Sequence, residues 1–339
     1  MLERPHLADE RIVACLSKEY GLRVAEISFL PLGADRSTAV YCVVADDGTP
    51  FFLKLRSGGF DETSVALPKF LSDQGIEQII APLTTSAGRL WASLDPFKVI
   101  LAPYVEARNG YQVVFSDHHW RVLGAAMKRI HTVVVPPALR RCIRSETYSP
   151  HWREVARSFL RRVEKSTFED PVAARVAALL RVRRDLILDL IARADALALA
   201  LQARPPESVL CHSDLHAGNL LIDAIDALYI VDWDDPILAP KERDLMFAGG
   251  AQGFAGHTPQ EEEALFYQVY GQTLIHPLAL AYYRYERIVQ DIAVFCEQLL
   301  LTGEGGEDRE QSFRYLASNF LPDGTIEVAY RSDRTRTEG

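Results

Sequence analysis

Short apolar runs alternate with turn signals over the first hundred residues of this 339-residue chain. The runs mix β-branched with aromatic residues, and turn sequences such as "DDGTP" lie between them, which is typical of an antiparallel meander. The strands predicted in this way are residues 24–32, 39–46, 50–57, 89–94 and 97–105. A helical pattern at 61–75 follows the third strand; it ends at Gly75, and Pro68 inside it predicts a kink or a break.

After Pro103 the pattern changes to long helices, so we place a hinge near residues 102–110. Ser116 is the expected N-cap of one helix, and Thr258 with Glu261 forms a capping box for another. The helices predicted in this part are 116–133, 149–164, 171–202, 259–270 and 277–301. Only three short runs interrupt them with strand patterns: 208–212, 219–223 and 228–232. The chain is therefore predicted to be an α+β protein.

Three polar residues lie at the ends of those short strands: Asp214, Asn219 and Asp232. We expect the strand ends to meet at one edge, which would bring the three side chains together. Carboxylate and amide oxygens are hard ligands that suit Mg²⁺ carried by a nucleotide. If Asn219 and Asp232 hold the metal, Asp214 is left to accept the proton of an attacking hydroxyl. This division of labour is that of a kinase.

Composition and charge narrow the class of protein. Hydrophobic residues make up 48% and charged residues 24%, which is typical of a globular chain. Residues 140–184 hold twelve basic and five acidic residues, but their helical spacing favours a solvated helix face over a nucleic-acid surface. Residues 214–310 hold eighteen acidic and five basic residues, a field that attracts metal ions or an amine-bearing substrate.

Location and partners are predicted from what the sequence does not contain. It has no signal-peptide pattern and no apolar run of about 18 residues, so we expect a cytoplasmic protein without a membrane partner. The five cysteines are scattered and form no CxxC pair, which argues against a disulfide framework or a zinc site. No pattern indicates an obligate protein partner, and the oligomeric state is left open.

The motif "HSDLHAGN" at 212–219, followed by "YIVD" ending at Asp232, resembles the H-x-D-x-x-x-x-N signature of the aminoglycoside phosphotransferase and choline kinase superfamily. The stretches "IVDWDDPILAPKERDLMF" and "YYRYERIVQDIAV" resemble one branch of it, the spectinomycin phosphotransferases, and weaker similarity extends to "GAD" at 33–35. The resemblance implies a bilobal protein-kinase-like fold. Residues 1–102 would form a small antiparallel-sheet lobe that binds nucleotide, and residues 103–339 a larger, mainly helical lobe for catalysis and substrate binding.

The resemblance also implies how ATP, or GTP, is bound. Lys54 matches the strand lysine that holds the α- and β-phosphates, and Glu62, or alternatively Asp61, would be its carboxylate partner. Ser37 or neighbouring amides could contact phosphate, but "PLGADRST" at 31–38 has one glycine, and an ordinary turn is an equal alternative. The backbone groups expected to bind adenine are those of Leu101, Ala102 and Tyr104. Asp244 matches an aspartate that braces the catalytic loop.

The acceptor implied by the resemblance is an aminocyclitol antibiotic, most closely spectinomycin, whose phosphorylation would confer resistance. Besides Asp214, the expected substrate contacts are Glu286, Asp291 and Tyr283, since amines need carboxylates and ring faces. A plainer alternative is that Arg287 pairs with Asp291 on a solvated helix face. Two other functions fit the same motifs: a kinase for choline, homoserine or a sugar, and a nucleotide-binding pseudokinase.

Overall fold

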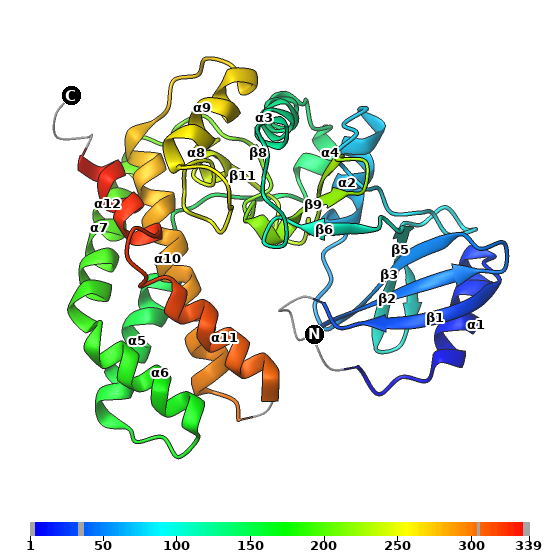
Figure 1. Cartoon of the computed structure of the whole chain (residues 1–339), viewed down its shortest axis with the longest axis horizontal. Helices are drawn as coiled ribbons and strands as arrows, with labels where there is room; N and C mark the ends of the chain where they lie inside the picture. Colours follow the sequence, from blue (N-terminus) through cyan, green and yellow to red (C-terminus); the bar gives the residue numbers. More distant parts are fainter. Residues whose placement is uncertain (1–3, 33–36, 304–305, 335–339) are drawn as a thin grey trace. The chain divides into compact units, whose positions relative to one another are not determined.

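The computed structural model describes residues 4–32, 37–303 and 306–334 (Figure 1). The chain forms two compact units, each built from two separate stretches. Residues 1–143 and 214–236 form the first unit, and residues 144–213 and 237–339 form the second. The predicted division into lobes after residue 102 stays a prediction. Within the described ranges, no helix combines the length and the apolar composition needed to span a membrane.

A five-stranded antiparallel sheet forms the first part of the first unit, as predicted. Its order is β1-β2-β3-β5-β4. The strands are β1 (Val24–Leu30), β2 (Thr38–Ala45), β3 (Pro50–Ser57), β4 (Ala92–Leu94) and β5 (Phe97–Pro103). Alternation along β3 buries Leu53 and Leu55 in the apolar core on one face of the sheet and directs Lys54 and Arg56 to the other face.

Two helices accompany this sheet. The helix α2 (Thr63–Asp73) follows β3 as predicted, and Pro68 lies buried inside it without breaking it. The helix α1 (Asp9–Tyr20) was not predicted from the sequence. It packs Ile12 and Leu16 into the core of the sheet and ends at Gly21, which adopts the left-handed conformation that glycine favours.

The rest of the first unit carries the sequence motif. A three-stranded sheet has the order β10-β9-β6, with β6 (Ala107–Asn109), β9 (Leu220–Asp223) and β10 (Leu228–Ile230). The short 3₁₀ helix η1 (Ala217–Asn219) precedes β9. The helix α3 (Asp117–Thr132) begins at the predicted N-cap Ser116, and α4 (Pro137–Arg140) follows.

The second unit is mainly helical. Its small sheet has the order β7-β11-β8, with β7 (Arg144–Ser145), β8 (Val209–Cys211) and β11 (Ile237–Ala239). Its helices are α5 (His151–Lys165), α6 (Pro171–Val182), α7 (Arg184–Ala203), α8 (Glu242–Leu245), α9 (Pro259–Tyr270), α10 (Pro277–Leu300), α11 (Gly306–Ser318) and α12 (Thr325–Arg334). The helix α10 packs against α5, α7, α11 and α12.

Two sequence expectations for this unit are corrected. The single helix predicted at 171–202 is two helices, because the backbone leaves helical geometry at Arg183 (φ −96°, ψ 9°). The three short strands do not share one edge: β8 pairs with β11, while β9 and β10 form a hairpin in the other unit. The apolar stripe of 277–301 is confirmed, since Tyr285, Ile288 and Ile292 are buried.

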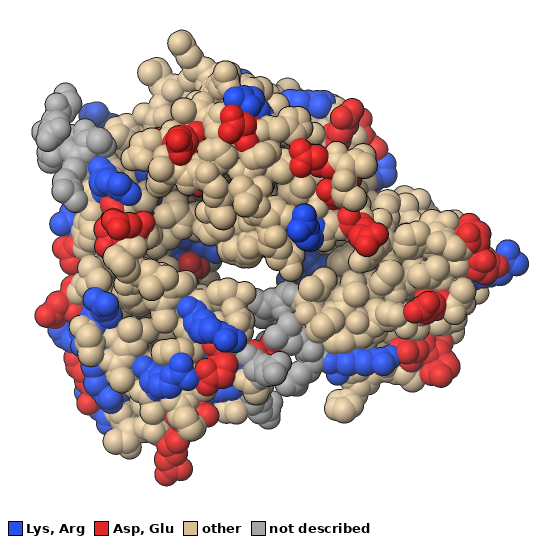
Figure 2. Space-filling view, viewed as in Figure 1, with Lys and Arg blue, Asp and Glu red and all other residues tan. Residues whose placement is uncertain are grey.

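Charges on the helices of the second unit are mixed. Figure 2 shows Lys and Arg side chains interleaved with Asp and Glu over this part of the molecule. Named ion pairs account for part of the pattern: Arg175 with Glu310, and Arg184 with Glu164. On the face shown, the arginine-rich segment is therefore a solvated helix surface with paired charges and no continuous basic patch.

Candidate active site

A backbone brace immediately precedes Asp214. The buried carboxylate of Asp244 accepts a hydrogen bond from the amide of His212 at 2.9 Å and another from the amide of Ser213 at 2.7 Å. Ser213 has a φ of +76°, a conformation that costs a non-glycine residue free energy unless its surroundings hold it. The two bonds supply that restraint, and they are the bracing role that the resemblance implied for Asp244.

Asn219 fixes the position of Asp214. Its amide nitrogen donates to the main-chain oxygen of Asp214 at 2.9 Å and lies 3.3 Å from the carboxylate oxygen Oδ2. Asn219 is buried, and its own backbone is bonded on both sides, to the carbonyl of His216 and from the amide of Val231. The side chain of Asp214 is one-third exposed. The structure therefore holds a solvent-accessible carboxylate on a rigid loop.

His216 lies beside the same carboxylate. Its Nδ1 accepts a hydrogen bond from the amide of Gly218 at 3.0 Å, so in the neutral ring the proton is on Nε2. Nε2 lies 3.6 Å from Oδ2 of Asp214. The hydroxyl of Tyr111 lies 3.2 Å from Nδ1, and the two rings stack with centroids 5.9 Å apart. The ring of His216 is therefore oriented from both sides toward Asp214.

The β9–β10 hairpin brings Asp232 to the same region of the first unit as Asn219. Leu220 pairs with Ile230, so the residue before β9 and the residues after β10 lie at one end of the hairpin. Asp232 has a φ of +66°, and its side chain is 48% exposed. At the other end, Nε2 of His119 contacts Asp226 at 2.8 Å in the hairpin turn, which ties the hairpin to α3.

The donor set at this end of the hairpin fits a divalent cation. Because the nitrogen of the Asn219 amide faces Asp214, its oxygen is the atom left for a ligand. The half-exposed carboxylate of Asp232 supplies further oxygens. An all-oxygen set of this kind suits Mg²⁺ rather than a soft metal. Asn219 and Asp232 therefore fit the metal that the sequence predicts.

Lys54 forms a different ion pair from the one predicted. Its ammonium bonds both carboxylate oxygens of Asp234, at 2.9 and 2.8 Å, and lies 3.4 Å from Asp232. Arg56 donates to the same carboxylate of Asp234. The predicted partner Glu62 is exposed at the N-terminus of α2 and is not bonded to Lys54, so that pairing is corrected. The alternative, Asp61, instead accepts a bond from the amide of Thr63.

The charges of this cluster are mutually stabilised. Burial alone would lower the pKa of the Lys54 ammonium, but the carboxylates of Asp232 and Asp234 raise the pKa above its usual range. Burial would likewise raise the pKa of Asp234, but the cations Lys54 and Arg56 lower it. The ammonium of Lys54 and the carboxylate of Asp234 are therefore both charged at neutral pH.

The predicted adenine and phosphate contacts lie on and beside the five-stranded sheet. Leu101 is buried, and its carbonyl accepts a bond from Leu83 at 2.7 Å, whereas the amide of Tyr104 lies 3.4 Å from the carbonyl of Pro50. Ala102 pairs with Phe52 in the sheet. The carbonyl of Ser37 accepts bonds from the amide and the hydroxyl of Ser57. Residues 33–36 of the predicted phosphate loop, including "GAD", lie outside the described residues. The nucleotide contacts remain predictions.

The predicted substrate residues lie on α10 in the second unit. Glu286 is buried and forms an ion pair with the buried Arg153, and burial raises the pKa of Glu286 to about 7 despite that pair. Asp291 pairs with Arg287 at 2.9 Å, as the plainer alternative predicts. Tyr283 is fully buried, with the Arg243 guanidinium 5.4 Å from its ring centre.

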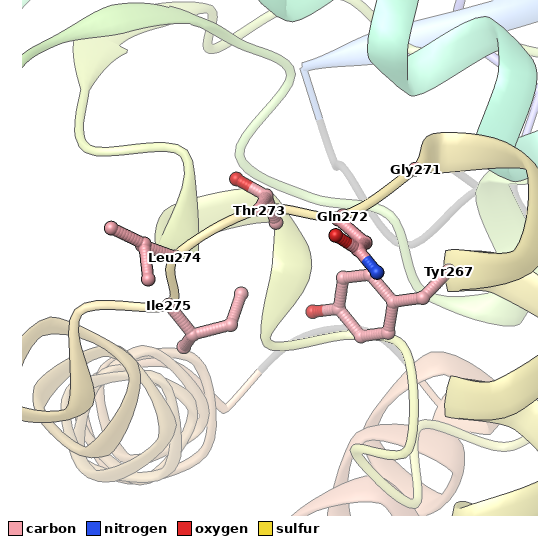
Figure 3. Close-up of a pocket in the computed structure, with 6 residues that line it drawn as sticks. All are labelled: Tyr267, Gly271, Gln272, Thr273, Leu274 and Ile275. Atoms are coloured by element: carbon pink, nitrogen blue, oxygen red, sulfur yellow. The ribbon is translucent and has the colours of Figure 1, made fainter.

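A hollow elsewhere in the second unit contains none of the predicted site residues. Its volume is about 530 Å³, and it lies along the connection between α9 and α10. The lining residues are Tyr267, Gly271, Gln272, Thr273, Leu274 and Ile275 (Figure 3). Leu274 points away from the ring of Tyr267, and it is 92% exposed. The lining has no carboxylate or amine, so the hollow is unsuited to the predicted chemistry.

The sequence reading missed four residues of the site: Arg56, Tyr111, His119 and Asp234. For two of them, the position in the sequence indicated a place in the site. Arg56 stands two positions after Lys54 on a strand, so both side chains share a face, and Asp234 stands two positions after Asp232. For Tyr111 and His119 it did not, because their contacts with His216 and Asp226 join segments more than one hundred residues apart.

Comparisons with known proteins agree with this geometry. The phosphotransferase enzyme family matches residues 28–280. A spectinomycin phosphotransferase solved with ADP and spectinomycin is 35% identical, with a TM-score of 0.90 over 98% of this chain and 100% of that chain. An AMP-bound complex of spectinomycin phosphotransferase is also 35% identical, with a TM-score of 0.85 over 96% of this chain and 99% of that chain.

More distant matches show the fold alone. An ethanolamine kinase from Plasmodium vivax is 15% identical over 90% of this chain and 83% of its own length, with a TM-score of 0.59. Among curated proteins, none matches the chain. The predicted α+β, kinase-like fold is confirmed by these structural matches and by the five-stranded antiparallel sheet.

Proposed function

Because the chain belongs to the phosphotransferase enzyme family, we propose that it transfers the γ-phosphate of ATP to a hydroxyl of an aminocyclitol antibiotic, with spectinomycin as the leading substrate. The observation that carries the proposal is the arrangement of Asp214, Asn219 and Asp232 in the first unit beside a charged Lys54. The full-length similarity to a spectinomycin phosphotransferase supports the choice of acceptor. In a bacterium exposed to the drug, this activity would confer resistance.

Asp214 is the proposed catalytic base. Its carboxylate is exposed enough to meet a hydroxyl, and the amide of Asn219 holds it in one orientation. A base positioned in this way accepts the hydroxyl proton as the oxygen attacks phosphorus. His216 and Tyr111 narrow the positions that the carboxylate can take. The contribution of these residues is mainly positioning, which is the main source of catalysis in phosphoryl transfer.

Nucleotide binding is assigned to the sheet side of the first unit. Lys54 is the proposed ligand of the α- and β-phosphates, and the backbone of Leu101, Ala102 and Tyr104 the proposed adenine contact. Ser37 is a second candidate for phosphate. Asn219 and Asp232 would hold Mg²⁺, which when bound supplies neutralisation of phosphate charge. The donor is ATP in this proposal, with GTP as the alternative that a nucleotide comparison resolves.

The proposed substrate contacts on α10 differ in how well the structure supports them. Asp291 is partly exposed, and an amine of the drug could replace Arg287 as its partner. Glu286 and Tyr283 are both buried, so direct contact with a substrate requires each side chain to become exposed. For Glu286, the ion pair with Arg153 would also have to open. Support for Glu286 and Tyr283 therefore comes from the sequence resemblance, and support for Asp291 from its exposure as well.

The test is an acceptor screen with the purified chain. Incubation with ATP, Mg²⁺ and spectinomycin should yield ADP and a product heavier by one phosphate group, measured by mass spectrometry. Choline, homoserine and simple sugars are the comparison acceptors. Turnover of one of these with none of spectinomycin would reject the antibiotic assignment. ADP binding without transfer to any acceptor would favour the pseudokinase alternative.

A further inference from the structure

Arg56 and Lys54 place two cationic groups around one carboxylate. Both project from the same face of β3, and both donate to Asp234. The side chains are largely shielded from water, with exposures of 18% for Lys54, 21% for Arg56 and 25% for Asp234. Lys54 also lies 3.4 Å from Asp232, and Nε of Arg56 donates to the carbonyl of Gly59 at 3.3 Å. These acceptors and the carboxylate of Asp234 do not match all eight N–H donors of the guanidinium and the ammonium.

This pair of cations matches the chemistry of a phosphate group. A nucleotide phosphate carries more charge than a carboxylate and more acceptor oxygens, and arginine bonds phosphate through two parallel N–H donors. Asp234 lies where such a group would bond both side chains. The carboxylate of Asp234 therefore occupies a position beside both cations that suits an anion.

The neighbouring segment 31–38 differs in sequence from a glycine-rich phosphate loop. It has one glycine and no GxGxxG pattern. Ser37 at its end bonds Ser57, the residue after Arg56, and Thr38 pairs with Arg56 across the sheet. The backbone of Arg56 is thus fixed beside Ser37 and Thr38.

We propose that Arg56 is a second phosphate-binding cation of the nucleotide site, and that Asp234 holds it beside Lys54 until nucleotide phosphate takes the place of the carboxylate. This inference rests on the proposed function in one respect, the use of a nucleotide as phosphate donor. It makes Asp234 a competitor of the nucleotide when no metal is present. Removing the charge of Asp234 should therefore strengthen nucleotide binding, whereas removing a structural residue should weaken it.

The experiment measures the affinity of the full chain for ADP, AMP and adenosine by calorimetry in EDTA, so that metal does not contribute. Arg56→Gln should weaken ADP about tenfold, or ~1.4 kcal/mol, and leave adenosine unchanged. Arg56→Lys should lose less than Arg56→Gln, because it keeps the charge but not the fork. Arg23→Gln is the matched control, since Arg23 is an exposed arginine near the same sheet that pairs with Asp46.

Asp234→Asn tests the direction in which ADP affinity changes when the competing charge is removed. Without the competing charge, ADP should bind a few times more tightly in EDTA, since two cations are released for phosphate. Equal losses of ADP and adenosine affinity in Arg56→Gln, or weaker ADP binding in Asp234→Asn, would overturn the proposal. Parent chain that binds ADP but leaves spectinomycin unmodified would contradict the proposed acceptor and leave this test intact. A parent that binds no ADP would contradict both.

Discussion

The amide nitrogen of Asn219 lies 2.9 Å from the main-chain oxygen of Asp214 and 3.3 Å from its carboxylate. One buried side chain thus orients the proposed base through its nitrogen and offers its oxygen to the proposed metal. Because both functions belong to one planar amide, the direction of the base and the position of the metal are fixed together. This coupling explains why an asparagine, rather than a second aspartate, suits the position: a carboxylate at 219 would repel Asp214.

Asn219→Asp should therefore reduce activity strongly, although the two side chains have nearly the same size. It retains metal-binding oxygens but replaces the donor with a like charge 3.3 Å from the Asp214 carboxylate. We expect kcat to fall at least a hundredfold, with a shift of the pH profile toward lower pH, where one of the two carboxyls is protonated. A pH profile identical in shape to that of the parent would contradict this view of Asn219.

Gly218→Ala tests the orientation of His216. A Cβ at this position would lie 2.7 Å from Cε1 of His216 and 2.9 Å from Cε2 of Tyr111, so both rings would have to move. We expect a fall in kcat of about tenfold or more, because misplacement near the base is costly, with nucleotide affinity retained. Gly303→Ala is the matched control, since a Cβ there meets nothing within 4 Å. Equal rates in the two variants would contradict the positioning role of His216.

His119→Leu tests whether the contact between α3 and the turn of the β9–β10 hairpin is needed for stability and activity. The substitution removes the bond to Asp226 and the bond that Nδ1 accepts from the amide of Ser116. We expect a loss of unfolding free energy of roughly 1–3 kcal/mol, measured by urea denaturation. Activity of the folded variant should also fall, because the hairpin carries Asn219 and Asp232. Asp226→Asn is the informative partner, since it keeps an acceptor for Nε2 and should retain most stability.

Glu262 makes stability depend on pH. It is buried, it accepts a bond from the amide of Gly249 at 3.0 Å, and burial raises its pKa to about 7. Because the folded state holds this proton more tightly than the unfolded chain, stability from this group is fully present below about pH 4.5 and is lost as pH rises to about 7.

Glu262→Gln should remove that loss, since the neutral amide still accepts from Gly249. At pH 8 the variant should be more stable than the parent, by at most roughly 3 kcal/mol, and at pH 4.5 the two should be nearly equal. Urea unfolding at both pH values measures this. The control is Glu169→Gln at an exposed position, which should show no such pH dependence. A variant less stable than the parent at pH 8 would contradict the assignment.

The parts of the fold that sequence predicts well are those fixed by local chemistry. Ser116 and the Thr258–Glu261 capping box begin their helices where expected, because each side chain bonds a backbone amide only three residues away. The five strands of the first sheet follow from alternation and turn residues. In each case the signal and the structure it specifies lie within one segment.

The parts that sequence predicts poorly depend on contacts between distant segments. The partner of Lys54 is Asp234, 180 residues away, and not Glu62 on the helix that follows. The strand β8 pairs with β11, which no local pattern at 209–211 reveals. Pro68 lies inside α2 without breaking it because buried Val65, Leu67 and Leu71 keep the helix packed. Tertiary contacts decided all three.

Asp214→Asn tests most directly whether Asp214 is the catalytic base beside a bound nucleotide. The amide has nearly the same size but cannot accept the hydroxyl proton. We measure transfer to spectinomycin and ADP affinity on the same preparation. We expect transfer to fall by several orders of magnitude while ADP affinity and thermal stability stay close to the parent values. Transfer within tenfold of the parent, or loss of ADP affinity in step with activity, would contradict the role of Asp214 as the base.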